Sequence, residues 1–125
     1  MLRRLTVRNY AIIKELDMAF GEGFTIITGE TGAGKSILLG ALGLVLGERA
    51  DTSVLLSHDE KCIVEAEFNI RGYDLEEIFG ENGVDYDDDA LLRREITPSG
   101  KSRAFLNDTP VNLAVMKELG ARLID

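Results

Sequence analysis

The sequence predicts an α/β fold in which a strand, a glycine-rich loop and a helix adjoin an antiparallel β subdomain. Residues 24–28 are β-branched or aromatic, and they lead through the loop into an apolar run of helical length, residues 37–46. Residues 62–70 alternate between apolar and polar side chains, and a glycine-containing turn, Pro98-Ser99-Gly100, separates two further strand-like segments. We therefore expect residues 1–125 to form one domain.

The loop is Gly29-Glu30-Thr31-Gly32-Ala33-Gly34-Lys35-Ser36, and it fits the phosphate-binding pattern G-x-x-x-x-G-K-[ST] at every fixed position. Between a strand and a helix, such a loop curls backbone N–H groups around phosphates, and the helix N-terminus adds partial positive charge. Lys35 would reach the β- and γ-phosphates, and Ser36 would offer its hydroxyl to Mg²⁺. A plain glycine-rich turn is the alternative. The strand before the loop and the helix after it favour a P-loop site for a nucleoside triphosphate, which extends from Gly29 to Ile37.

Length and composition are typical of a soluble domain. A net charge of −8 argues against a nucleic-acid-binding surface over the whole chain, so any basic patch must be local. The single cysteine, Cys62, excludes an internal disulfide framework, and with only His58 nearby it cannot complete a four-ligand zinc site. We see no targeting segment and no apolar run that could span a bilayer, so we expect a cytoplasmic protein without membrane contacts.

The segments around the loop follow local patterns. Residues 2–7 and 16–20 alternate like strands and are expected to pair as an antiparallel ribbon, after which Gly21-Glu22-Gly23 turns the chain toward residues 24–28. The helix over residues 37–46 is apolar on nearly all sides, which predicts burial between layers and an end near Gly47. Its interior glycines, Gly40 and Gly43, each cost about 1 kcal/mol relative to alanine, which close packing would explain.

A polar loop, residues 48–60, leads into the strand over residues 62–70. Asp74 is then expected to be the N-cap of a short helix that ends near Phe79, with Glu77 reaching back in a capping box. The acidic run at residues 85–89 is interpreted as a solvated loop rather than a metal site.

A β-hairpin is expected over residues 90–107, with its register set by the turn at residues 98–100. Pairing Thr97 with Lys101 places Glu95 opposite Arg103 and puts Arg94 on the apolar face. The basic side chains of the hairpin could contact DNA phosphates, but we favour structural roles, with Arg103 paired to Glu95; these residues are Arg93, Arg94, Lys101 and Arg103.

The chain ends in a predicted helix. Residues 107–110 form a turn, and Asn112 can cap a helix in which Leu113, Met116, Leu119 and Leu123 lie at helical spacing.

The arrangement of these segments narrows the class of phosphate-loop protein. A strand ribbon before the loop and a β-rich segment after it do not suit a small kinase, where strands and helices simply alternate, but they suit the N-terminal lobe of an ABC-type ATPase head. Several stretches also closely resemble the RecN family of bacterial DNA repair ATPases, which belongs to the SMC-like group: residues 9–13, 28–39, 46–51, 91–96, 102–107 and 119–125. The resemblance covers nearly the whole chain.

The resemblance implies one half of an SMC-type head, with a coiled coil and the C-terminal half lying beyond residue 125. It implies ATP and Mg²⁺ as cofactors. The implied partners are the C-terminal half of the same head, a second protomer engaged through ATP, and DNA during double-strand break repair and recombination, in a nucleoid-associated protein. The segment itself supplies only the phosphate cradle, including Lys35 and one metal ligand, so we expect it to bind nucleotide with little hydrolysis.

Arg49 follows the phosphate helix at a position that resembles an arginine-bearing loop of the SMC-like group, where it couples DNA or the second head to ATP turnover. An exposed arginine near a helix C-terminus is the structural alternative. Two positions depart from the wider group, Ala11 where a basic residue is common and Gly40 where an aspartate is usual, although RecN shares the alanine. Two other functions stay open, an ATP-gated non-enzymatic dimerisation or DNA-tethering module and the nucleotide-binding domain of an ABC transporter.

Overall fold

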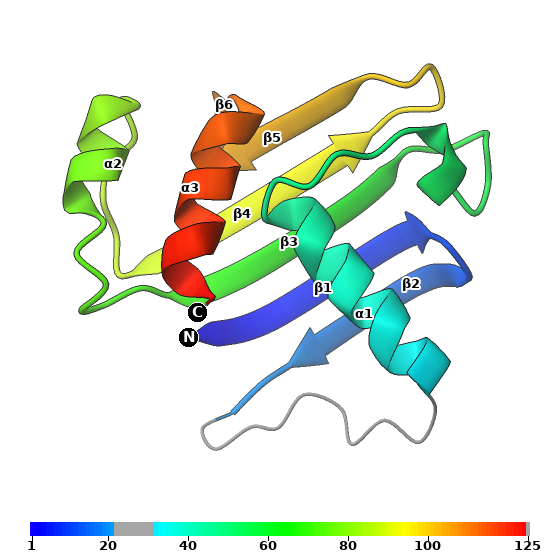
Figure 1. The fold of residues 1–125 in the computed structure, drawn as a ribbon, viewed down its shortest axis with the longest axis horizontal. Helices are drawn as coiled ribbons and strands as arrows, with labels where there is room; N and C mark the ends of the chain where they lie inside the picture. Colours follow the sequence, from blue (N-terminus) through cyan, green and yellow to red (C-terminus); the bar gives the residue numbers. More distant parts are fainter. Residues whose placement is uncertain (22–31, 125) are drawn as a thin grey trace.

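A six-stranded antiparallel sheet runs through the part of the chain that the computed structural model describes, residues 1–21 and 32–124. Its order is β2-β1-β3-β4-β5-β6, so the strand ribbon at the N-terminus forms one edge and the hairpin region forms the other (Figure 1). The strands are β1 (Leu2–Tyr10), β2 (Ile13–Ala19), β3 (Cys62–Asn69), β4 (Asp89–Ile96), β5 (Ser102–Leu106) and β6 (Thr109–Val111).

Two helices, α1 (Gly32–Val45) and α3 (Leu113–Leu123), lie across one face of the sheet (Figure 1). The short helix α2 (Glu76–Glu81) lies at one end of the sheet, between β3 and β4 in the chain, and a single 3₁₀ turn, η1 (Thr52–Val54), follows α1. The core is the layer between α1, α3 and the sheet, because the alternate residues of the central strands that face the helices are buried; they include Leu5, Val7, Val64, Ala66, Phe68, Leu92, Ile96, Ala104 and Leu106.

The structure confirms the predicted ribbon, strand and hairpin. β1 and β2 pair antiparallel, and β3 buries Val64, Ala66 and Phe68 as its alternation predicts. The hairpin has the predicted register, with Arg94 opposite Ala104. The final helix also forms as predicted, and the side chain of its N-cap, Asn112, accepts a hydrogen bond from the backbone N–H of Val115.

The phosphate helix differs from the prediction at its start and in its burial. Helix α1 begins at Gly32, inside the glycine-rich loop, rather than at residue 37. Its sheet-facing side is buried, but Leu39 remains 47% exposed, because in the described part of the chain the sheet covers only one side of the helix. The expectation of burial on all sides is therefore wrong for this segment. The predicted strand over residues 24–28, together with Glu22 and Gly23, lies outside the described residues.

The predicted capping box at Asp74 is wrong. The backbone of Asp74 has φ 58, in the left-handed region, and Leu75 takes the N-cap position without a side-chain hydrogen bond. Helix α2 then continues through Gly80 to Glu81. Leu75 is fully buried, so packing of this apolar residue, rather than a polar cap, fixes where the helix starts. The predicted turn over residues 107–110 is too long, because only Asn107 and Asp108 form the turn and Thr109 and Pro110 belong to β6. The 3₁₀ turn η1 was not predicted.

Candidate phosphate site at the start of helix α1

The glycine-rich loop meets the described structure at the N-terminus of α1. Gly29, Glu30 and Thr31 lie outside the described residues, whereas residues 32–36 form the first turn of the helix. Ser36 is exposed, and Ile37, the next residue, is half-buried. The first turn contains no acidic residue of its own that would oppose the partial positive charge of the helix N-terminus. This end of α1 is chemically suited to an anion, and a phosphate is the anion that the sequence pattern predicts.

Side chains lie close to the two glycines inside α1, and the packing is tighter at Gly40, because its neighbour Tyr10 is partly buried whereas Glu48, near Gly43, is exposed. A Cβ on Gly40 would lie 2.5 Å from the hydroxyl oxygen of Tyr10, and one on Gly43 would lie 2.7 Å from the carboxylate of Glu48. Burial, together with the nearby Cys62 and Glu48, raises the pKa of Tyr10, so its hydroxyl stays protonated. Sequence reasoning did not identify Tyr10 as a neighbour of the helix. The only signal in the sequence for such a neighbour was the loss of helix stability that two interior glycines cause, which had to be compensated by close packing.

Arg94 holds the other end of α1. The side chain is 1% exposed, and its Nη1 donates hydrogen bonds to the carbonyl oxygens of Leu44 at 2.8 Å and Glu48 at 2.7 Å. Its Nε donates to Ser102 Oγ at 2.9 Å. The predicted place of Arg94 on the apolar face is thus confirmed, and its structural role is to bind the carbonyl oxygen of Leu44 in the last turn of α1 and that of Glu48 in the loop that follows.

Arg93 also has a structural role, but the predicted partner of Glu95 is wrong. Arg93 pairs with Glu95 and lies over the ring of Phe105, 5.1 Å from its centroid. Lys61 Nζ is a second partner of Glu95, at 3.3 Å. Arg103 is opposite Glu95 in the register but makes no ion pair with it. Arg93, two residues before Glu95 on the same strand, occupies the buried carboxylate, and Arg103 remains exposed.

Arg49 is exposed in the loop after α1. Within the described part of the chain it makes no hydrogen bond or ion pair, whereas Asp51 close by is engaged in accepting a hydrogen bond from the backbone N–H of Ser53. Arg49 is therefore available to a partner.

Other candidate chemistry is weak in the described part of the chain. No group of three or more His, Cys, Asp or Glu side chains there is arranged to hold a metal ion. In the acidic run, Asp87 accepts from the backbone N–H of Asp89, and Tyr86 donates to Asp88. Burial raises the pKa of the Cys62 thiol to about 11, so it is unreactive at neutral pH. None of the described helices is long and apolar enough to cross a membrane.

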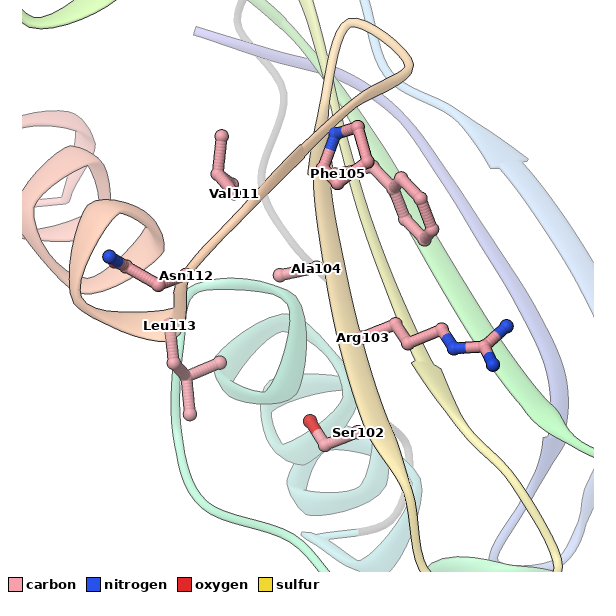
Figure 2. A pocket seen from close by; sticks show the side chains of 8 residues that line it. Ser102, Arg103, Ala104, Phe105, Val111, Asn112 and Leu113 are labelled. Atoms are coloured by element: carbon pink, nitrogen blue, oxygen red, sulfur yellow. The ribbon is translucent and has the colours of Figure 1, made fainter. Parts of the chain in front are cut away.

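A cleft of about 510 Å³ lies at the free edge of the sheet, beside β5 and the start of α3 (Figure 2). Arg103 and Phe105 project on one side of β5, and Val111, Asn112 and Leu113 line the other. The cleft is built from different elements than the start of α1, so it does not belong to the phosphate site.

Comparison with known proteins identifies the family. The model of the AAA domain matches residues 4–103. Over its whole length the chain is 44% identical to the DNA repair protein RecN of Vibrio cholerae, 40% identical to that of Xylella fastidiosa and 38% identical to that of Bacillus subtilis. It spans only 23% of the first two proteins and 22% of the third.

Solved structures give the same result for the fold. The Smc head domain of Pyrococcus furiosus, solved with an extended coiled coil, matches 99% of this chain with a TM-score of 0.72 at 22% identity, and the chain covers 33% of it. An SMC ATPase studied for ATP-driven dimerization matches with a TM-score of 0.71 at 22% identity, covering 99% of this chain and 80% of that one. The chain belongs to the AAA domain family, has the fold of an SMC-type ATPase head, and resembles the N-terminal head segment of RecN in sequence.

Proposed function

We propose that this chain is the ATP-binding segment of a RecN-like ATPase that acts in DNA double-strand break repair and recombination. One observation carries the proposal: a complete phosphate-loop pattern leads into α1, in a chain that matches RecN proteins from end to end. Because the chain spans 23% of such a relative, the activity belongs to the longer protein. Its place would be the cytoplasm, in association with the nucleoid.

The proposed nucleotide site consists of residues 29–37. The backbone N–H groups of the loop and of the first turn of α1 would hold the phosphates, and Lys35 would neutralise the β- and γ-phosphate charge. Ser36 would provide one ligand to Mg²⁺, and its exposure supports this role. Hydrolysis also needs a group that orients the attacking water, which we assign to the C-terminal half of the head.

The proposed partners are the C-terminal half of the same head, a second protomer and DNA. The exposed side of α1 supports the first of these, because Leu39 is an apolar residue without cover in the described part of the chain. Arg49, exposed in the loop that follows α1, is our candidate for contact with DNA or with the second protomer. Repeated engagement of two heads by ATP would then drive DNA tethering.

Two alternative functions can be told apart from the proposed one by experiment or by sequence. In the first, ATP binding gates dimerisation or tethering and hydrolysis is incidental. A non-hydrolysable ATP analogue that supports DNA tethering as well as ATP does would favour this alternative. In the second, the chain is part of an ABC transporter. About 200 heptad-patterned residues directly downstream in the gene would exclude that reading.

Hydrolysis by the complete protein tests the proposal. We expect DNA-stimulated ATP hydrolysis that Lys35→Ala lowers by about 100-fold or more, because the developing phosphate charge loses its cation. Arg71→Ala is the matched control, since Arg71 is an exposed cation in the turn after β3. Equal hydrolysis by the two variants would contradict the assignment of the site.

A further inference from the structure

The loop between α1 and β3, residues 48–60, is attached to the turn between β1 and β2. The backbone N–H of Ala11 donates to the carbonyl oxygen of Val54 at 2.7 Å, and Tyr10 pairs with Leu55 in an isolated antiparallel bridge. In Figure 1 the loop leaves the end of α1 and passes the β1–β2 turn before it enters β3. Two segments that lie about 40 residues apart in the chain therefore meet here.

Asn9 fixes the far end of the same loop with its side chain. Its Nδ2 donates to the carbonyl oxygens of Ser57 and Glu60, both at 2.9 Å, and its Oδ1 accepts from the backbone N–H of Ser57 at 2.7 Å. The side chain is buried, and its backbone φ of 55 lies in the left-handed region, which asparagine tolerates better than most residues. Asn9 thus satisfies three backbone groups of the loop at once.

Tyr10 connects this turn to the phosphate helix. Its hydroxyl fills the space over Gly40, in the middle of α1, where even a methyl group would overlap it. Because the Tyr10 hydroxyl packs against α1 at Gly40, a rotation or shift of α1 would press on this side chain and so on the turn. The chain of contacts runs from α1 through Tyr10 and its neighbour Asn9 to the loop.

We propose that the turn at residues 9–11 positions the loop 48–60 according to whether nucleotide is bound at the start of α1, with Asn9 as the positioning residue. The proposal rests on the proposed nucleotide site in residues 29–37. Phosphates bound at the first turn would change the position of α1, and the turn would pass the change to the loop. Arg49, which this loop carries, would be placed for its partner only when ATP is present.

Amide hydrogen exchange in the complete protein, with and without Mg²⁺ and a non-hydrolysable ATP analogue, tests this coupling. Asn9→Gly is the key variant, because glycine keeps the left-handed backbone without strain and removes all three hydrogen bonds. Asn9→Asp keeps the acceptor for Ser57 but loses both donors, so it should give an intermediate result. His58→Ala is the matched control, because His58 is exposed in the same loop and makes no hydrogen bond within the described part of the chain.

In the wild type and in His58→Ala we expect nucleotide to slow exchange in residues 48–60 by about threefold or more. In Asn9→Gly, exchange should be fast with and without nucleotide, while the Kd for the analogue stays within about twofold of wild type. If nucleotide still slowed exchange in residues 48–60 of Asn9→Gly by about threefold, as in the wild type, Asn9 would only anchor the loop, and the proposal would be overturned. Failure of the wild type to bind nucleotide would instead refute the proposed site, and the binding titration separates the two results.

Discussion

The two glycines of α1 show how single residues tie the phosphate helix to its surroundings. Gly40 faces the hydroxyl of Tyr10, and Gly43 faces the carboxylate of Glu48, so each lets a polar side chain approach the helix backbone. Alanine would be favoured at both positions by helix propensity alone, by about 1 kcal/mol. At Gly40 the cost is therefore set against close packing by the partly buried Tyr10, whereas at Gly43 the neighbour is the end of an exposed side chain that could move aside.

A double-mutant cycle tests this account of Gly40. In the wild-type background, Gly40→Ala should fail to stabilise the protein, because its Cβ overlaps the Tyr10 hydroxyl. In a Tyr10→Phe background the hydroxyl is gone, and the same change should stabilise by about 1 kcal/mol. Urea unfolding measures both values. Gly80→Ala in α2 is the control, because nothing lies near its added Cβ, and it should change the free energy of unfolding equally in the two backgrounds. An equal effect of Gly40→Ala in both backgrounds would contradict the account.

Glu95 gives the protein a defined acid sensitivity. Burial alone would raise the pKa of Glu95, but hydrogen bonds from Arg93 and Lys61 outweigh it and lower the pKa below its ordinary value of 4.5. The charged form is thus favoured in the folded state, so this contribution to stability is present above that value and disappears as pH falls through the lowered pKa. The side chain is 2% exposed, so it titrates inside the fold.

We therefore expect Glu95→Gln to destabilise the protein at pH 7 and to lose that effect progressively as the pH falls below 4.5 and through the lowered pKa of Glu95. Denaturant midpoints across this range measure the difference between variant and wild type. Glu118→Gln, at an exposed position of α3, should show no comparable trend. A Glu95→Gln effect that is constant with pH would refute the assigned ion pairs.

At the scale of elements, the hairpin between β5 and β6 depends on two residues with left-handed backbones. Asn107 has φ 48 and Asp108 has φ 66, the pattern of a type I′ turn. The Oδ1 of Asn107 also accepts a hydrogen bond from the backbone N–H of Leu91 at 2.7 Å. Asn107 and Asp108 thus share a left-handed backbone, but of the two only the Asn107 side chain accepts a hydrogen bond from β4.

Glycine at these two positions should therefore have opposite effects. Asp108→Gly relieves the left-handed backbone and should stabilise by about 0.5 kcal/mol. Asn107→Gly relieves the same strain but leaves the N–H of Leu91 without its acceptor, and it should cost about 1 kcal/mol. Thermal or urea unfolding distinguishes them. Stabilisation by both changes would show that the bond from Leu91 contributes nothing.

The elements also show which features the sequence could predict. Strands β1 to β5 and helix α3 follow from alternation, helical spacing and a good N-cap, which are local signals. The capping box at Asp74 failed because burial of Leu75 decided where α2 starts, and that depends on the rest of the fold. The neighbours of Gly40 and Arg94 were not predictable either, since both contacts join segments far apart in the chain. The phosphate-loop pattern, by contrast, is a contiguous signal.

At the scale of the whole molecule, the chain has the fold of an SMC-type head but only part of the length of its RecN relatives. The sheet covers one side of α1, and Leu39 on another side is exposed. Both observations are consistent with the proposal that the phosphate site is one half of a catalytic centre that a longer protein completes. Lys35 carries the central claim, because its charge is the part of the proposed site that a single substitution removes most cleanly.

Equilibrium binding of Mg²⁺·ATP to the complete protein tests this claim most directly. We predict saturable binding by the wild type and an affinity at least about 100-fold lower for Lys35→Ala, a loss of about 2.7 kcal/mol. The Arg71→Ala control should bind as the wild type does. Wild-type affinity in a folded Lys35→Ala protein would contradict the assignment of residues 29–37 as the nucleotide site.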